Sequence, residues 1–179
     1  AAQLESQGNR IAGGIEEIKK KMASIVTRLE QVPDTNPNGT IQKPFNTASG
    51  WTRPVNGAYR SAGTWYYAGG GVHLGYDFAA AVGTPMLAVG NGVVLKSTDG
   101  CLTIGGLGSS CGPAHGGSYG GGNQVYLLTK INGNLYAVKY LHLQQGSPIS
   151  TGTVVLAGQQ IGRLGSSGNS SGPHCHVEI

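Results

Sequence analysis

The sequence predicts a mainly β protein, with an antiparallel β-sheet domain preceded by one N-terminal helix of coiled-coil character. Three observations support this fold class. Only four of the 32 glycines precede residue 44, so the rest of the 179-residue chain is glycine-rich and poorly suited to long helices. Short runs of β-favouring residues recur between these glycines. Two of the runs are joined by Asn132-Gly133, a dipeptide typical of tight β-hairpins.

Residues 1–30 are predicted to form the helix. Apolar residues recur there at steps of seven, four, three, four, three and four, which places them along one helix face. These residues are Leu4, Ile11, Ile15, Ile18, Met22, Ile25 and Leu29. An isolated helix with such an apolar face needs another surface to pack against. Two interpretations stay open: the helix packs on the main domain, or it is a stalk that binds a coiled-coil partner through residues 1–30.

Residues 31–50 are predicted to be a linker, because Pro33, Pro37 and Pro44 exclude a continuing helix. The main domain is therefore predicted to span residues 51–179. Its expected strands lie at 86–89, 92–96, 124–130, 135–143, 154–156 and 175–179.

The charge distribution excludes some classes of function. The net charge is +4, but Lys19, Lys20 and Lys21 cluster on the predicted helix. From residue 45 onward the sequence has six basic and three acidic residues, and the basic residues do not form a dense stripe. This balance does not support nucleic-acid binding, although it is compatible with an anionic polymer such as a bacterial wall. No apolar run is long enough for a transmembrane segment.

The cysteines give a clue to the compartment. Cys101 and Cys111 bracket a loop with little of its own to bury, and a disulfide there would stabilise it by roughly 2 to 3 kcal/mol. A disulfide indicates an oxidising, extracytoplasmic setting. The alternative is two unpaired thiols in a flexible loop. Cys175 lies between two histidines, and strand alternation turns it to the opposite face as a buried structural thiol.

Four of the five histidines lie in three short segments that together indicate a metal site. Strand alternation places His174 and His176 on one face. It also places His73 and Asp77 on one face, with Leu74, Tyr76 and Phe78 on an opposite, apolar face. Imidazoles and a carboxylate suit zinc, and a catalytic zinc takes three protein ligands. The surplus imidazoles are then available for proton transfer and oxyanion stabilisation.

Two further groups of side chains receive weaker interpretations. His115 has no motif partner and is predicted to be a solvated loop histidine. Trp65, Tyr66 and Tyr67 either line a substrate groove or pack on the sheet, and the sequence favours neither.

Six motifs in order resemble the lysostaphin-type zinc endopeptidases, which are the M23 peptidases with LytM domains. They are His-x-Gly-x-Asp-Phe-Ala-Ala (73–80), Gly-Thr-Pro (83–85), Gly-Asn-x-Val (122–125), Tyr-Leu-His-Leu (140–143), Ile-Gly-x-x-Gly-Ser-Ser-Gly (161–168) and Ser-Gly-Pro-His-x-His-Val-Glu-Ile (171–179). The resemblance covers residues 51–179. The glycine-dense stretch from 99 to 122 departs from a minimal domain of this family and is expected to form a long surface loop.

The resemblance implies a Zn²⁺ ion held by His73, Asp77 and His176, with His142 and His174 as a catalytic pair that does not bind the metal. It implies hydrolysis of peptide cross-links or stem peptides in bacterial peptidoglycan, outside the cytoplasm, by a secreted, wall-associated or phage-borne chain. One imidazole of the pair would accept a proton from water and the other would stabilise the oxyanion, with the two roles left open. The alternatives are a non-catalytic LytM-type module that binds the wall or activates another hydrolase, and a structural wall or phage-tail component.

Overall fold

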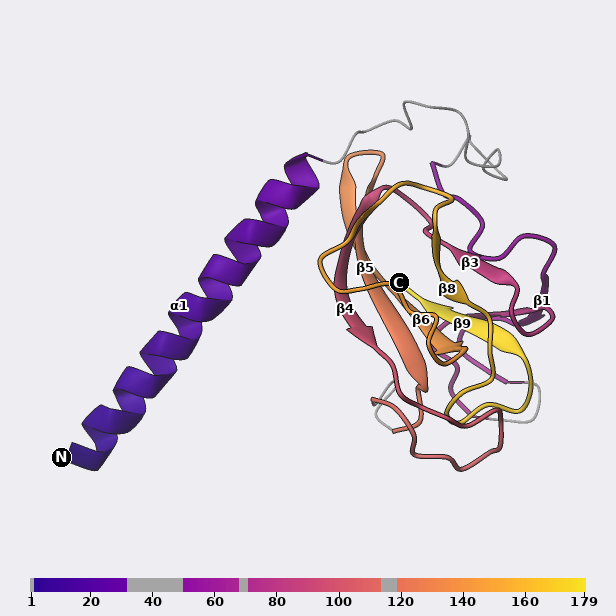
Figure 1. Cartoon of the computed structure of the whole chain (residues 1–179), viewed down its shortest axis with the longest axis horizontal. Helices are drawn as coiled ribbons and strands as arrows, with labels where there is room; N and C mark the ends of the chain where they lie inside the picture. The colour runs from indigo at the N-terminus through magenta and orange to yellow at the C-terminus, as the bar shows by residue number, and fades with distance from the viewer. Residues whose placement is uncertain (1, 32–49, 68–70, 114–118) are drawn as a thin grey trace.

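The computed structural model describes residues 2–31, 50–67, 71–113 and 119–179 (Figure 1). Nearly all of the linker predicted at 31–50 lies outside the described residues, as does His115. The division of the chain at residues 30 and 50 therefore stays a prediction.

Antiparallel sheets form the main body, which confirms the predicted fold class. Among the described residues, seven strands form one sheet in the order β1-β2-β9-β6-β5-β4-β7, and β3 pairs with β8. Every pairing is antiparallel. The strands are β1 (Tyr59–Ala62), β2 (Tyr76–Ala79), β3 (Pro85–Leu87), β4 (Gly92–Thr98), β5 (Asn123–Ile131), β6 (Asn134–Leu143), β7 (Val154–Val155), β8 (Gln160–Arg163) and β9 (His174–Glu178).

The hairpin between β5 and β6 follows from its turn residues. Asn132 and Gly133 have φ angles of 50° and 80°, the left-handed values that a two-residue hairpin turn requires. The expected strands did not include β1, β2 or β8, and the strand alternation applied to residues 73–78 holds only from Tyr76, where β2 begins, so His73 lies outside the strand. β1 is a largely exposed edge strand and β8 has four residues, so neither carries a strong alternation of apolar and polar side chains.

One face of the large sheet packs on the core. Val138 and Tyr140 of β6 alternate inward, and the buried Tyr140 hydroxyl accepts a hydrogen bond from the Val89 amide at 3.0 Å. Cys175 of β9 lies in the same core, as alternation predicted. Burial raises the pKa of its thiol well above the ordinary value, with a smaller contribution from the Asp77 charge, so Cys175 is an unreactive structural thiol.

The apolar face predicted for residues 74–78 is only partly present. Phe78 packs on the core, but Leu74 and Tyr76 are exposed. β2 lies next to the edge strand β1, where the core cluster ends. The Tyr76 ring is covered instead by Arg60, whose guanidinium carbon lies 5.9 Å from the ring centroid.

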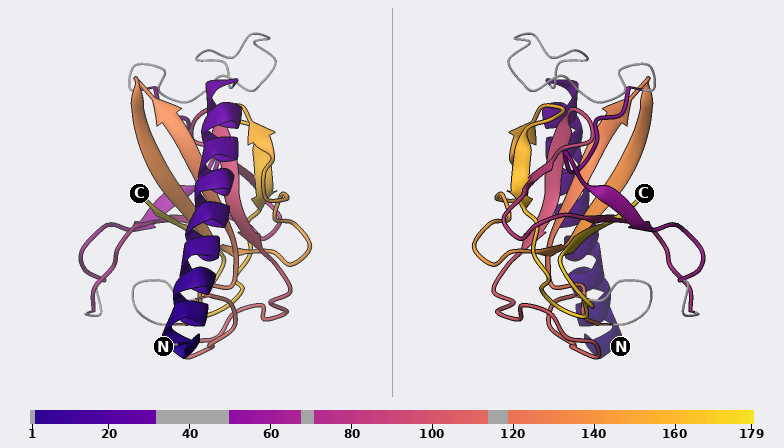
Figure 2. Two further views of the ribbon diagram at one scale, coloured as in Figure 1. Left: turned by 90° about the vertical axis from the view of Figure 1, so that its left-hand side faces the viewer. Right: turned by 90° about the vertical axis from the view of Figure 1, so that its right-hand side faces the viewer.

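In the N-terminal helix α1 (Ala2–Glu30), the apolar face is exposed at Ile15, Ile18 and Met22, and half-buried at Ile25 and Leu29. Figures 1 and 2 show its long axis standing away from the sheet, with its C-terminal end near β4. There the Arg28 guanidinium donates to the Gly152 carbonyl at 2.7 Å. Ile18 and Met22 are 58% and 60% exposed. In the described part of the chain, no helix is both long and apolar enough to cross a membrane.

A disulfide joins Cys101 and Cys111, which confirms the predicted pairing. The loop that it closes follows β4 and lies against the segment that precedes β9, where the Gly106 amide donates to the Ser170 carbonyl at 2.9 Å. Within the long loop expected between residues 99 and 122, the part from 101 to 111 is therefore a bridged element held against its neighbours, while residues 114–118 lie outside the described residues.

Candidate metal and catalytic centre

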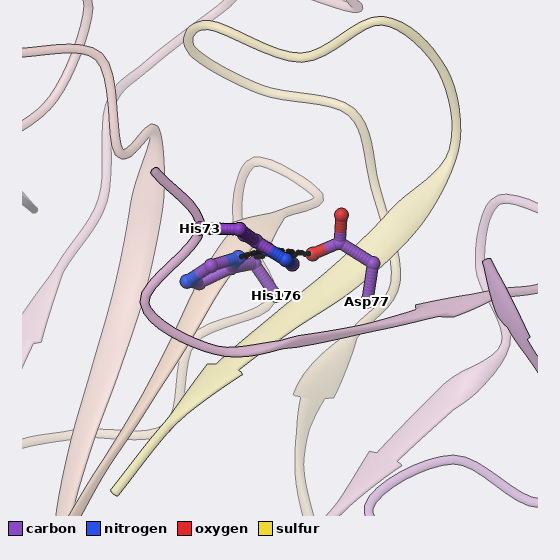
Figure 3. A group of neighbouring side chains, drawn as sticks. All are labelled: His73, Asp77 and His176. Carbon is purple, nitrogen blue, oxygen red and sulfur yellow. Dashed lines mark hydrogen bonds and ion pairs between the residues drawn. The ribbon is translucent and has the colours of Figure 1, made fainter. Parts of the chain in front are cut away.

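Three donor atoms converge on the sheet face opposite the core. His73 Nε2 lies 3.1 Å from Asp77 Oδ1 and 2.8 Å from His176 Nδ1, and the last two atoms are 2.9 Å apart (Figure 3). All three side chains are buried. The register Asp77↔His176 between β2 and β9 places two of the donors side by side. Among the described residues, these three form a group whose donor atoms could hold a metal ion.

In each histidine, the ring nitrogen that points away from the cluster donates a hydrogen bond, which leaves the lone pair on the nitrogen that points toward it. His73 Nδ1 donates to the Gly63 carbonyl at 2.6 Å, and His176 Nε2 donates to Glu178 Oε1 at 3.2 Å. In the neutral rings, the inner nitrogens then carry lone pairs and face the Asp77 carboxylate. Such a set of acceptors requires a cation or a proton among them. The residues therefore fit a metal ion with two nitrogen ligands and one oxygen ligand.

Burial and the neighbouring charges shift the pKa values of two members of this cluster. Burial alone lowers the pKa of His176, but its hydrogen bonds to Asp77 and Glu178 outweigh this effect and raise it. Burial likewise favours a raised pKa at Asp77, yet the hydrogen bond from His176 and the charges of His174, His176 and His73 lower it overall. The carboxylates of Asp77 and Glu178 thus favour the protonated form of the His176 imidazole.

Glu178 contacts the donor cluster, and the sequence reasoning assigned it no role. Its Oε1 accepts from His176, and its Oε2 accepts from Lys139 Nζ at 2.7 Å, across the register Lys139↔Glu178. The side chain is buried. The available signal was strand alternation: residues 174, 176 and 178 share one face of β9. Glu178 therefore fixes the ring orientation of the candidate ligand His176 through the ring nitrogen that points away from the cluster.

His142 reaches the same face because β6 contains a bulge. Asn123 pairs with Leu143 and Val125 pairs with Tyr140, so Leu141 and His142 together face the single residue 124. His142 has a φ of 63°, uncommon for a residue with a side chain. The bulge turns Leu143 into the core and His142 toward His174 of the neighbouring strand, with ring centroids 4.8 Å apart.

Both members of this pair are held through the same ring nitrogen. His142 Nδ1 donates to the Ser167 carbonyl and His174 Nδ1 to the Gly172 carbonyl, each at 2.8 Å. These bonds assign the ring proton to Nδ1, so Nε2 carries the lone pair in each neutral ring. His174 Nε2 lies 3.6 Å from Asp77 Oδ1, next to the candidate ligands. The structure thus brings all five predicted site residues together.

The three aromatic residues before His73 do not pack on the sheet. The Tyr67 ring stacks on His73, with centroids 4.3 Å apart, and Trp65 and Tyr66 are exposed. Burial raises the pKa of Tyr67, with further contributions from the Asp77 and Glu178 charges. The Trp65 amide donates to the His73 carbonyl at 2.6 Å, which ties this segment to a candidate ligand.

Replacing Glu178 by alanine is expected to weaken metal binding about tenfold to a hundredfold, because His176 loses the acceptor that orients it. Competition with a chelating dye measures the change. Glu178→Gln is the matched control, since an amide oxygen can still accept from His176 Nε2. An alanine variant with unchanged affinity would show that Glu178 does not support the site.

Metal affinity is expected to increase as pH rises above 6.5, the ordinary value for histidine. Because the metal-free His176 pKa is raised, metal binding releases a proton in the interval above that value and below the raised pKa. The raised His176 pKa also stabilises the folded metal-free protein. This stabilisation is fully present below pH 6.5 and is lost as pH rises through the raised pKa. The lowered Asp77 pKa stabilises the folded protein above pH 3.8, the ordinary pKa of this group. That stabilisation is lost as pH falls through the lowered pKa.

Calorimetric titration with zinc in buffers of different ionisation enthalpy measures this proton release. The melting temperature of chelator-treated protein should fall as pH is raised from 6.5. An affinity that does not change between pH 6 and pH 8 would contradict the raised pKa of His176.

Comparison with known proteins relates the β domain to wall hydrolases. The model of peptidase family M23 matches residues 71–179. Peptidoglycan DD-endopeptidase ShyC of Vibrio cholerae serotype O1 is 41% identical over 107 residues, which are 60% of this chain and 20% of that protein. Lysostaphin of Staphylococcus staphylolyticus is 34% identical over 109 residues, 61% of this chain and 18% of that protein. The chain thus spans about a fifth of the length of these relatives.

The fold agrees with that of a solved relative. The catalytic domain of the antimicrobial peptidase lysostaphin from Staphylococcus simulans superimposes with a TM-score of 0.51 and 31% identity. The match covers 68% of this chain and 79% of that domain.

Proposed function

The chain belongs to peptidase family M23, and from this premise we propose that it is a zinc-dependent endopeptidase that hydrolyses peptide cross-links or stem peptides of bacterial peptidoglycan. One observation carries the proposal: three buried donor atoms converge within 3.1 Å of one another, beside a second pair of imidazoles. Wall binding without catalysis would not require a complete set of metal donors or an adjacent pair of proton-transfer groups.

We propose His73, Asp77 and His176 as the ligands and zinc as the ion. Two imidazole nitrogens and a carboxylate oxygen are a donor set that zinc accepts, and three protein ligands leave a position for water. When bound, the ion supplies Lewis-acid activation of water and of the scissile carbonyl. The hydrogen bonds of His73 to Gly63 and of His176 to Glu178 hold the two rings ready for that ion.

We propose His142 and His174 as the catalytic pair. Each ring keeps its proton on Nδ1 through a main-chain carbonyl, so each offers Nε2 for chemistry. A neutral ring accepts the proton of the attacking water at Nε2 and returns it to the leaving amine. A ring protonated at Nε2 donates a hydrogen bond to the oxygen that becomes negative in the transition state. Two adjacent imidazoles can provide both functions.

The reaction is proposed to take place outside the cytoplasm, where peptidoglycan lies. The disulfide between Cys101 and Cys111 supports this location, because disulfides persist in oxidising compartments.

Digestion of defined peptidoglycans, followed by mass spectrometry of the released fragments, tests the proposed function. We expect new peptide termini in the presence of zinc and none after chelation. Intact wall peptides, from a protein shown to contain about one zinc per chain, would contradict it.

The exposed apolar face of α1 is proposed to bind a helical partner as a coiled coil. Four apolar side chains of the helix are at least 48% exposed: Ile15, Ile18, Met22 and Val26. A helix with such an exposed apolar face is marginally stable in water unless a partner covers the face. We expect an Ile18→Glu/Met22→Glu double variant to lose self-association or partner capture while it keeps peptidase activity. Sedimentation velocity measures the first property. An unchanged assembly state in this variant would contradict the proposal.

A further inference from the structure

We infer that the cystine loop, residues 101–111 closed by the Cys101–Cys111 disulfide, positions the side chains of His142 and His174, with Thr103 as a positioning residue. The inference rests on the proposed function, which gives this histidine pair its catalytic role. It concerns a loop that departs from a minimal domain of the family.

The cystine loop is hydrogen-bonded along the anchoring segment, residues 166–172. Three bonds join the two segments. They are Gly168 N–H to Thr103 Oγ1 at 2.7 Å, Gly108 N–H to Asn169 Oδ1 at 2.8 Å and Gly106 N–H to Ser170 O at 2.9 Å. The cystine loop therefore fixes the path of the anchoring segment.

The anchoring segment in turn holds both rings of the pair. His142 Nδ1 donates to Ser167 O at 2.8 Å, next to the residue bonded to Thr103. His174 Nδ1 contacts Gly172 O at 2.8 Å and Ser170 Oγ at 3.3 Å. One short segment thus selects the tautomer and the direction of both imidazoles.

The second end of the cystine loop reaches His142 through the backbone. Cys111 O accepts from the Gly122 amide at 3.0 Å, and the neighbouring Gly121 carbonyl accepts from the His142 amide at 3.1 Å. A Cβ at Gly122 would overlap the Ser167 carbonyl, so these backbones touch without intervening side chains. A shift of the loop is therefore passed directly to the segment that holds the ring.

The disulfide complements these hydrogen bonds, because the apolar side chains of the loop are not packed in the core. Leu102, Ile104 and Leu107 are 72%, 93% and 79% exposed, so its apolar side chains do not anchor it in the core. Cys101 is fixed by Asn123, which accepts from its amide at 2.8 Å and donates to its carbonyl at 2.9 Å. The disulfide ties Cys111 to this fixed point.

Two variants and two controls test the inference in the zinc-loaded full chain. Thr103→Val removes the acceptor for the Gly168 amide at nearly constant volume, and a Cys101→Ser/Cys111→Ser double variant opens the loop. Thr103→Ser keeps the hydroxyl, and Ile104→Ser alters an exposed side chain of the same loop. We expect the first two to lower kcat about tenfold to a hundredfold with little change in KM or zinc content, because the pair is misaligned. Both controls should retain wild-type kcat.

Long-range ¹H–¹⁵N NMR spectra of the imidazoles give a readout that does not depend on turnover. The wild type should show the Nδ1–H tautomer for His142 and His174. Thr103→Val should show mixed tautomers for this pair, with the signals of His73 and His176 unchanged. A Thr103→Val protein with wild-type kcat and tautomers would overturn the inference, even if the double variant failed to fold. If the wild type cleaves no wall peptide, the proposed function fails, and the tautomer spectra still decide whether the loop positions the rings.

Discussion

Replacing His142 or His174 by alanine is expected to reduce kcat by about 10² to 10⁴, the usual contribution of a positioned acid or base. Zinc content should stay near one ion per chain, because the three candidate ligands do not include either residue. The two rings are tilted neighbours with centroids 4.8 Å apart, so under the proposed mechanism they serve the same reacting atoms. The double variant should therefore lose little more than the worse single variant. Fragment release from defined peptidoglycan and metal analysis measure the two properties.

His115→Ala is the matched control for this experiment, since the sequence predicts a solvated loop histidine with no role. It should retain both activity and zinc. Full activity in His142→Ala and His174→Ala would remove the pair from the mechanism. An inactive control would instead place His115 in the site.

Replacing Asp77 by asparagine is expected to have the second large effect, a loss of more than about a hundredfold in metal affinity with a parallel loss of activity at limiting zinc. The Asp77 carboxylate lies 3.1 and 2.9 Å from the inner nitrogens of His73 and His176, and it supplies the negative charge among the three donors. An amide of the same shape removes that charge. Chelator competition measures the affinity.

The same substitution should remove metal-dependent stabilisation. An ion present at about a thousand times its dissociation constant stabilises the folded wild type by about 4 kcal/mol, and Asp77→Asn should show little of this rise in melting temperature. Asp99→Asn is the control, because Asp99 accepts from the Gly146 amide in an exposed turn. If the Asp77→Asn protein binds one zinc as tightly as the wild type, Asp77 is not a ligand.

Much of the fold follows from local sequence. The left-handed turn at Asn132-Gly133 determined the β5–β6 hairpin, because few other residue pairs adopt that geometry at low cost. Strand alternation separated Cys175 from His174 and His176, and the structure buries Cys175 in the core. β1 escaped prediction because an exposed edge strand carries no apolar alternation.

The sequence by itself therefore determined the fold class, through residue type and the two-residue period of a strand, and it identified the clustered side chains through residue type and the motifs that resemble the M23 family. Only the tertiary structure decided how the clustered side chains meet. The register Asp77↔His176 joins residues that are 99 positions apart, and the bulge at Leu141–His142 turns a ring that regular alternation would direct into the core. The support of His176 by Glu178 and Lys139 depends on a third strand. Registers and bulges arise from pairing between distant strands, and a local period carries no information about that pairing.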